Sequence, residues 1–125
     1  MTPTRPVFLD LWRIRLPVPG VVSILHRISG VLMVLSIPLL AALLAQALSG
    51  PEGFAATAAF FGNPLVKLGL LVMGWALLHH LLAGIRYLVI DVGWGVDRPT
   101  ARTTAWTVLV AAVAVTLIGA GGLLL

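Results

Sequence analysis

Histidines and arginines within apolar stretches are the residues of this sequence whose types and spacing can do chemistry. His26 and Arg27 lie in one long apolar stretch, and His79, His80 and Arg86 lie in a second. An ionisable side chain at the centre of a membrane helix costs about 2.5 kcal/mol or more, so such residues usually mark function. These five side chains are therefore the first candidates for a functional site.

Three polar residues of the first apolar stretch share one side of the predicted helix. Ser23 and Arg27 are four residues apart, and His26 is three residues beyond Ser23. A hydroxyl and a guanidinium one turn apart can bind a small polar head group, such as a quinone carbonyl. The alternative is that Arg27 extends to a lipid phosphate while Ser23 bonds to its own helix backbone.

The second apolar stretch contains the segment HHLLAGIRYLVID, in which His80, Gly84 and Tyr87 form one stripe at helical spacing. A glycine one turn from a histidine leaves the flat space that a haem needs when that histidine binds its iron. A neutral imidazole suits an apolar site, and the neighbouring arginines can pair with haem propionates. The alternative is a histidine that is hydrogen-bonded between helices.

Composition identifies the kind of protein that must position these residues. The chain has 125 residues, of which 60% are hydrophobic and only 10% are charged, whereas a soluble domain carries about 25% charged residues. The eight basic residues are scattered and form no basic face, so we expect no nucleic-acid binding. Cysteine is absent, which excludes iron–sulfur or zinc sites held by cysteines of this chain. The sequence predicts an integral membrane protein, in agreement with its mean hydropathy of +1.10.

The apolar stretches predict an all-α membrane protein with three transmembrane helices in a single domain over residues 1–125. A membrane helix needs about 20 mostly apolar residues. We expect a short N-terminal surface segment over residues 1–20, which Pro17 and Pro19 separate from the first helix. The expected boundaries are transmembrane helices at 21–48, 64–90 and 105–125, an outer loop at 49–63 and a cytoplasmic loop at 91–104.

The arginines predict the orientation of these helices. Three arginines precede the first helix and two lie in the loop over 91–104, whereas the loop over 49–63 contains no Lys or Arg. Because Lys and Arg concentrate on the cytoplasmic side, we expect the N-terminus to be cytoplasmic. Lys67, near the outer end of the second helix, can reach the interface through its flexible stem.

Four segments resemble the cytochrome b membrane subunit of bacterial succinate dehydrogenase, respiratory complex II. They are RPVFLDLWRIRLPV (5–18), SILHRISG (23–30), SGPEGF (49–54) and HHLLAGIRYLVID (79–91). The segments follow the family's order with the family's intervals. The combination of S-I-L-H-R with a downstream H-x-x-x-G-I-R is specific, while the third helix is similar only in hydropathy.

The resemblance implies a role for four of the candidate residues. His80 falls on the family's axial ligand of haem b, whose second axial histidine comes from a partner membrane subunit. Ser23 and Arg27 fall on residues that line the ubiquinone pocket. His26, together with Arg27, falls near the haem propionates.

Two residues need separate comment. Many relatives have a histidine where this chain has Tyr87, and a phenol can still donate a hydrogen bond to a propionate on the same side of the haem. His79 is a second candidate ligand, but it lies about 100° around the helix from His80 and does not fit the motif.

The resemblance implies a haem b-binding anchor of succinate:quinone oxidoreductase, passing electrons from succinate oxidation to ubiquinone in the bacterial inner membrane. The chain has no dinucleotide fingerprint and no cysteine, so we do not expect it to oxidise succinate itself. The implied partners are a flavoprotein subunit, an iron–sulfur subunit, a second haem-binding membrane anchor subunit and membrane lipid.

Two other hypotheses remain open at this point. An anchor of a quinol:fumarate reductase has the same architecture and runs the reaction in reverse. A haem-free small membrane transport or assembly protein would instead use the buried charges as a substrate path. A reduced-minus-oxidised visible spectrum separates the haem-binding hypotheses from the haem-free one.

Overall fold

The protein is a bundle of long helices, and the computed structural model describes residues 13–124, with side chains up to residue 121. Its elements are α1 (Val18–Leu48), α2 (Pro51–Gly62), α3 (Pro64–Asp91) and α4 (Arg98–Leu124). The described part contains no strand, so the predicted all-α class is confirmed. Most of the expected N-terminal surface segment lies outside the described residues.

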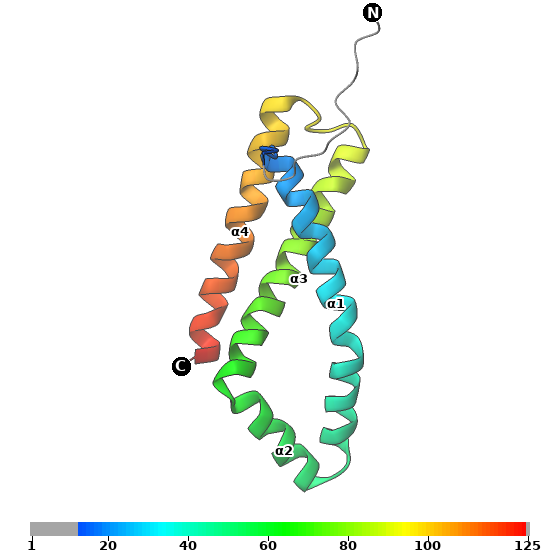
Figure 1. Cartoon of the computed structure of the whole chain (residues 1–125), viewed down its shortest axis with the longest axis vertical. Coiled ribbons are helices and arrows are strands. Elements are labelled where there is room, and N and C mark those ends of the chain that lie inside the picture. The colour runs from blue at the N-terminus through cyan, green and yellow to red at the C-terminus, as the bar shows by residue number, and fades with distance from the viewer. Residues whose placement is uncertain (1–12, 125) are drawn as a thin grey trace, which may run out of the picture.

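Three of the four helices can cross a membrane. α1, α3 and residues 98–121 of α4 are long and apolar enough to do so, which confirms the three predicted spans. Figure 1 shows these helices running beside one another, with the shorter α2 crossing obliquely between the ends of α1 and α3. Leucine, isoleucine and valine side chains cover much of the exposed surface, as expected for helices in contact with lipid or other membrane subunits.

The first span begins three residues earlier than expected. Pro17 has extended backbone and precedes α1, and Pro19 lies within its first turn. Proline is tolerated there because the first N–H groups of a helix have no partner inside it. The N–H groups of Gly20 and Val21 both donate to the Pro17 carbonyl, at 2.8 and 3.1 Å, so the helix is continuous where a break was expected.

The segment expected as an outer loop contains the helix α2. Gly50 has a φ of 134°, a conformation that favours glycine, and makes the sharp turn after α1. Gly53 packs so closely on the end of α1 that an added Cβ would collide with the Gln46 carbonyl and the Ser49 hydroxyl. The glycine and proline that indicated a loop therefore mark the turn into a short helix.

The loop between α3 and α4 is shorter than expected because α4 begins at Arg98. Asp97 caps this helix, since its carboxylate accepts the Thr100 N–H at 3.0 Å and the Thr100 hydroxyl at 2.8 Å. These donors stabilise the charged form and hold the pKa of Asp97 below its usual value. The cap therefore stabilises the first turn of α4.

Small residues allow the long helices to approach closely. Ala76 and Ala83 of α3, and Ala105 and Ala112 of α4, are fully buried. Val22 of α1 packs in the same core as Ala83 and Ala105. Small side chains at such interfaces let helix backbones come together in a membrane. α3 therefore lies between α1 and α4, and its polar residues meet both neighbours.

Candidate haem and quinone site

The packing of α1 against α3 brings three predicted site residues together. The rings of His26 on α1 and His80 on α3 are stacked, with centroids 4.0 Å apart and planes inclined by 13°. Tyr87, two turns further along α3, presents its ring edge-on to His26 at 5.3 Å. Its hydroxyl is buried and has no hydrogen-bond partner among the described residues.

Hydrogen bonds to α1 orient the His80 ring. Its Nδ1 lies 3.1 Å from the backbone carbonyl of His26 and 3.2 Å from the hydroxyl of Ser29. A carbonyl oxygen can only accept, so Nδ1 carries the proton and donates it. In the neutral ring Nε2 is then unprotonated, which is the form in which an imidazole nitrogen binds a metal.

Two glycines lie against the histidine pair, and at one of them, Gly30, an added side chain would crowd a ring. A Cβ on Gly30 would lie 3.0 Å from Cε1 of His80, so this residue of α1 makes room for the ring. A Cβ on Gly84 would lie 3.7 Å from Nε2 of His26. The space beside Gly84, which the sequence suggested for a haem, is thus adjacent to the His26 ring, and Gly30 makes the closer approach to His80.

An apolar groove of about 720 Å³ lies between α1 and α3, and His80 is part of its wall. This volume falls within the range of about 300–1,000 Å³ typical of cofactor and ligand pockets. The remaining wall combines aliphatic and thioether side chains with a few small residues, including Met33, Ile37, Leu40, Met73, Gly74 and Leu77. An apolar wall with one oriented imidazole fits the chemistry of a haem, whose macrocycle is apolar and whose iron commonly binds histidine.

The other predicted haem-ligand candidate, His79, does not line this groove. It is fully buried and stacks on Trp75 with ring centroids 5.3 Å apart. Neither of its ring nitrogens has a hydrogen-bond partner in the part of the chain that the structure describes. This geometry favours His80 over His79 as the residue facing a cofactor.

The predicted quinone residues lie on α1, outside the histidine stack. Ser23 is half-buried, and among the described serines and threonines it alone makes no side-chain hydrogen bond. The expected alternative, a bond from Ser23 to its own helix, is thus not formed. Arg27 is exposed and lies outside the cluster of rings, which is formed by His26, His80 and Tyr87. Both quinone-site candidates therefore have polar groups available to a ligand.

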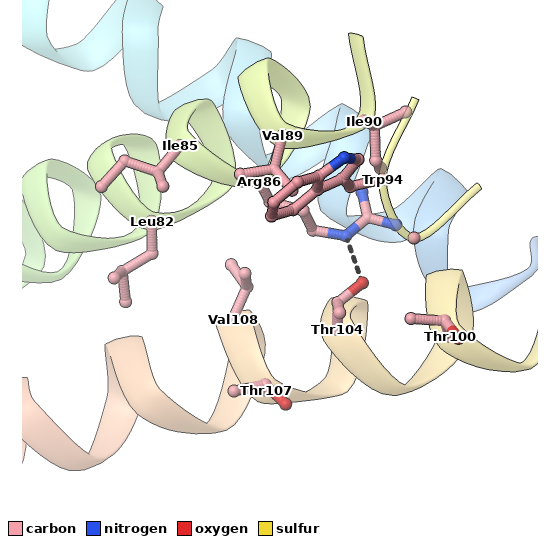
Figure 2. A pocket seen from close by; sticks show the side chains of 11 residues that line it. Leu82, Ile85, Arg86, Val89, Ile90, Trp94, Thr100, Thr104, Thr107 and Val108 are labelled. Carbon is pink, nitrogen blue, oxygen red and sulfur yellow. Dashed lines mark hydrogen bonds between the residues drawn. The ribbon is translucent and has the colours of Figure 1, made fainter. Parts of the chain in front are cut away.

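Arg86 joins α3 to α4. Only 7% of this residue is exposed, and its Nε donates to the Thr104 hydroxyl at 3.0 Å while Nη2 donates to the Ala101 carbonyl at 2.8 Å. Figure 2 shows the guanidinium reaching from α3 toward α4, in the wall of a pocket that Trp94 also lines. Its Cζ also lies 5.6 Å from the centroid of the Tyr87 ring, within cation–π range. The interhelical hydrogen bonds give Arg86 a structural role that the sequence had left unassigned.

Sequence analysis missed two contributors to this site. Ser29 is fully buried and contacts His80, and Thr104 accepts the Arg86 hydrogen bond. The only signal for Ser29 was its position three residues after His26, on a face that already carried polar residues. Nothing in the sequence indicated a role for Thr104, because its contact with Arg86 depends on how α3 and α4 pack.

The fold and site define a class of protein: an α-helical membrane protein with three spans, in which two neighbouring helices hold a histidine pair beside an apolar groove. The model of one family, described as "Succinate dehydrogenase/Fumarate reductase transmembrane subunit", matches residues 1–119. The chain belongs to this family.

Individual relatives agree with this assignment. The chain is 39% identical over 121 residues to the succinate dehydrogenase cytochrome b556 subunit of Coxiella burnetii, covering 95% of this chain and 97% of the relative. It is 33% identical over 109 residues to the subunit of the same name from Paracoccus denitrificans, with 87% and 84% covered. The corresponding Rickettsia felis subunit is 28% identical over 114 residues, with 91% and 89% covered.

The Arg86 contact generates a stability prediction. Arg86→Ala removes two hydrogen bonds from a charged donor, each worth about 1.5–3 kcal/mol, and should lower the unfolding temperature of the detergent-solubilised protein. Arg102→Ala is the matched control, because it removes an exposed arginine from the turn of α4 whose Ala101 and Thr104 accept the Arg86 hydrogen bonds. Equal unfolding temperatures for the two variants would show that the α3–α4 contact does not depend on Arg86.

Proposed function

We propose that this chain is the haem b-binding membrane anchor of a succinate:quinone oxidoreductase and passes electrons from succinate oxidation to ubiquinone. The observation that carries the proposal is His80, which lines an apolar groove with Nδ1 hydrogen-bonded and Nε2 as the nitrogen available to iron. Membership of the family supports the assignment of this site to a cytochrome b subunit.

His80 is the residue that would hold the haem iron. The described residues place one imidazole on the groove, so the second axial histidine would come from a partner membrane subunit. His26, Tyr87 and Arg27 would face the propionates, and the unpartnered Tyr87 hydroxyl is a suitable donor for a carboxylate. When bound, haem b supplies a one-electron carrier close to the quinone site.

Ser23 and Arg27 would bind the quinone head group. The Ser23 hydroxyl has no hydrogen-bond partner among the described residues, and the exposed Arg27 guanidinium lies one turn further along the same face. Reduction of a quinone takes up two electrons and two protons, and negative charge develops on its oxygen as the electrons arrive. A hydrogen bond from Arg27 would strengthen with that charge, while Ser23 would donate a neutral one.

The partners follow from the chemistry that this chain lacks. Flavin and iron–sulfur centres belong to a flavoprotein subunit and an iron–sulfur subunit, and the second membrane anchor would complete the haem site. Arg13, Arg15, Arg98 and Arg102 lie beside the starts of α1 and α4, which supports a cytoplasmic location of this end in the bacterial inner membrane.

Succinate oxidation is the favoured direction. The family description covers both succinate dehydrogenase and fumarate reductase, whereas each of the three relatives above is named as a succinate dehydrogenase subunit. A haem-free transport role has less support, because the groove between α1 and α3 has an apolar wall rather than a polar path.

Haem ligation is tested by the two adjacent histidines. His80→Ala should weaken or abolish the b-type spectrum of the purified complex, because it removes the groove-facing nitrogen. His79→Ala should retain that spectrum and serves as the control. A normal spectrum in His80→Ala together with a lost spectrum in His79→Ala would assign the iron to His79 instead.

Quinone binding is tested by two assays on the same membranes. Arg27→Ala should lower succinate:ubiquinone activity by roughly 10²–10³-fold, the usual effect of losing a donor to a developing oxyanion. Succinate oxidation with an artificial acceptor at the soluble subunits should stay near normal. Ser23→Ala should show the same pattern more mildly, and Arg102→Ala should change neither activity.

The two activities separate the possible roles of Arg27. A parallel fall in both would show that the residue serves assembly of the complex. Unchanged quinone activity would show that Arg27 contacts lipid and that the quinone binds elsewhere.

A further inference from the structure

Ser29 contacts both His80, the proposed haem ligand, and the backbone carbonyl of His26. Ser29 is fully buried, and its hydroxyl donates to the His26 carbonyl at 2.9 Å. The same hydroxyl oxygen lies 3.2 Å from Nδ1 of His80, and that nitrogen lies 3.1 Å from the same carbonyl. Three polar atoms from two helices thus lie within hydrogen-bond distance of one another.

The available protons fit only one arrangement of these contacts. The Ser29 hydroxyl has a single proton, and it is directed to the carbonyl of His26. The hydroxyl oxygen is therefore an acceptor toward His80, as the carbonyl is. If Nδ1 were unprotonated, its lone pair would face two acceptors in a partly buried site, which is costly. Both contacts consequently require the proton on Nδ1.

We propose that Ser29 is a positioning residue for the haem: together with the His26 carbonyl, it fixes the tautomer and ring orientation of His80 so that Nε2 is presented to the groove. The inference rests on the proposed ligation of haem by His80. Partners of the second ring nitrogen orient a metal-binding histidine and increase its basicity. A more basic ligand favours the ferric state, so Ser29 also lowers the midpoint potential of the haem.

The chain offers a matched control for this inference. Ser49 lies directly after α1, and its hydroxyl donates to the Gln46 carbonyl at 2.7 Å, the same bond to the residue three positions earlier. Ser49 lies outside the groove and makes no hydrogen bond to a histidine in the described part of the chain. Ser29→Ala and Ser49→Ala therefore remove the same group, and only Ser29→Ala removes a contact with His80.

The experiment uses the complete complex purified with its partners. Haem content per flavin, the haem midpoint potential in a redox titration and the low-spin ferric EPR signal are measured for each variant. Ser29→Ala should bind haem about tenfold more weakly, shift the midpoint potential to a more positive value and change the EPR g values. Ser49→Ala should match the wild type in all three measurements.

A second pair of variants controls for packing and assembly. Ser29→Thr keeps the hydroxyl and Ser29→Val replaces it by a methyl group of similar shape, so the threonine variant should preserve the potential and the valine variant should not. Equal behaviour of these two variants, including equal failure to assemble, would contradict the role of Ser29. Identical potentials and EPR signals in Ser29→Ala and Ser49→Ala would also contradict it while leaving haem binding intact. A wild-type complex without haem would instead overturn the proposed function.

Discussion

The contact between α1 and α3 at His26 and His80 is the interaction on which the rest of the site depends. A polar imidazole between apolar helices must find its hydrogen-bond partners within the protein, because lipid offers none. α1 supplies them through the His26 carbonyl and the Ser29 hydroxyl, and Gly30 leaves the room that the ring needs. The hydrogen bonds that satisfy the His80 ring also determine which of its nitrogens is available to a ligand.

The polar residues of α3 differ in role according to the neighbouring helix that each one contacts. His80 faces α1 and the groove, whereas Arg86 extends to the first turn of α4 and is held there by Thr104 and Ala101. The Arg86 contact sets the position of α4 beside α3, and Tyr87 connects the two regions through its contacts with His26 and Arg86. Charged groups at similar depths of a membrane protein can therefore have different roles.

The sequence predicted the spans well because they depend on a local feature, the long apolar stretches. A histidine motif, also a local feature, singled out His80, which the structure places in the groove wall. The sequence predicted α2 poorly, since Gly50 and Pro51 can mark either a loop or the start of a helix. It suggested Gly84 as the glycine that clears space near His80, whereas Gly30 on the neighbouring helix makes the closer approach. That pairing, like the Arg86 contact with α4, depends on the register between helices, which no local pattern encodes.

The central claim is that this chain presents His80 to a haem whose other axial ligand comes from a partner. The most direct measurement is the reduced-minus-oxidised visible spectrum of the purified wild-type complex, recorded before and after exposure of the reduced protein to carbon monoxide. The account predicts a b-type haem whose spectrum carbon monoxide does not change, because histidines occupy both axial positions. The absence of b-type haem, or a haem that binds carbon monoxide readily, would contradict it.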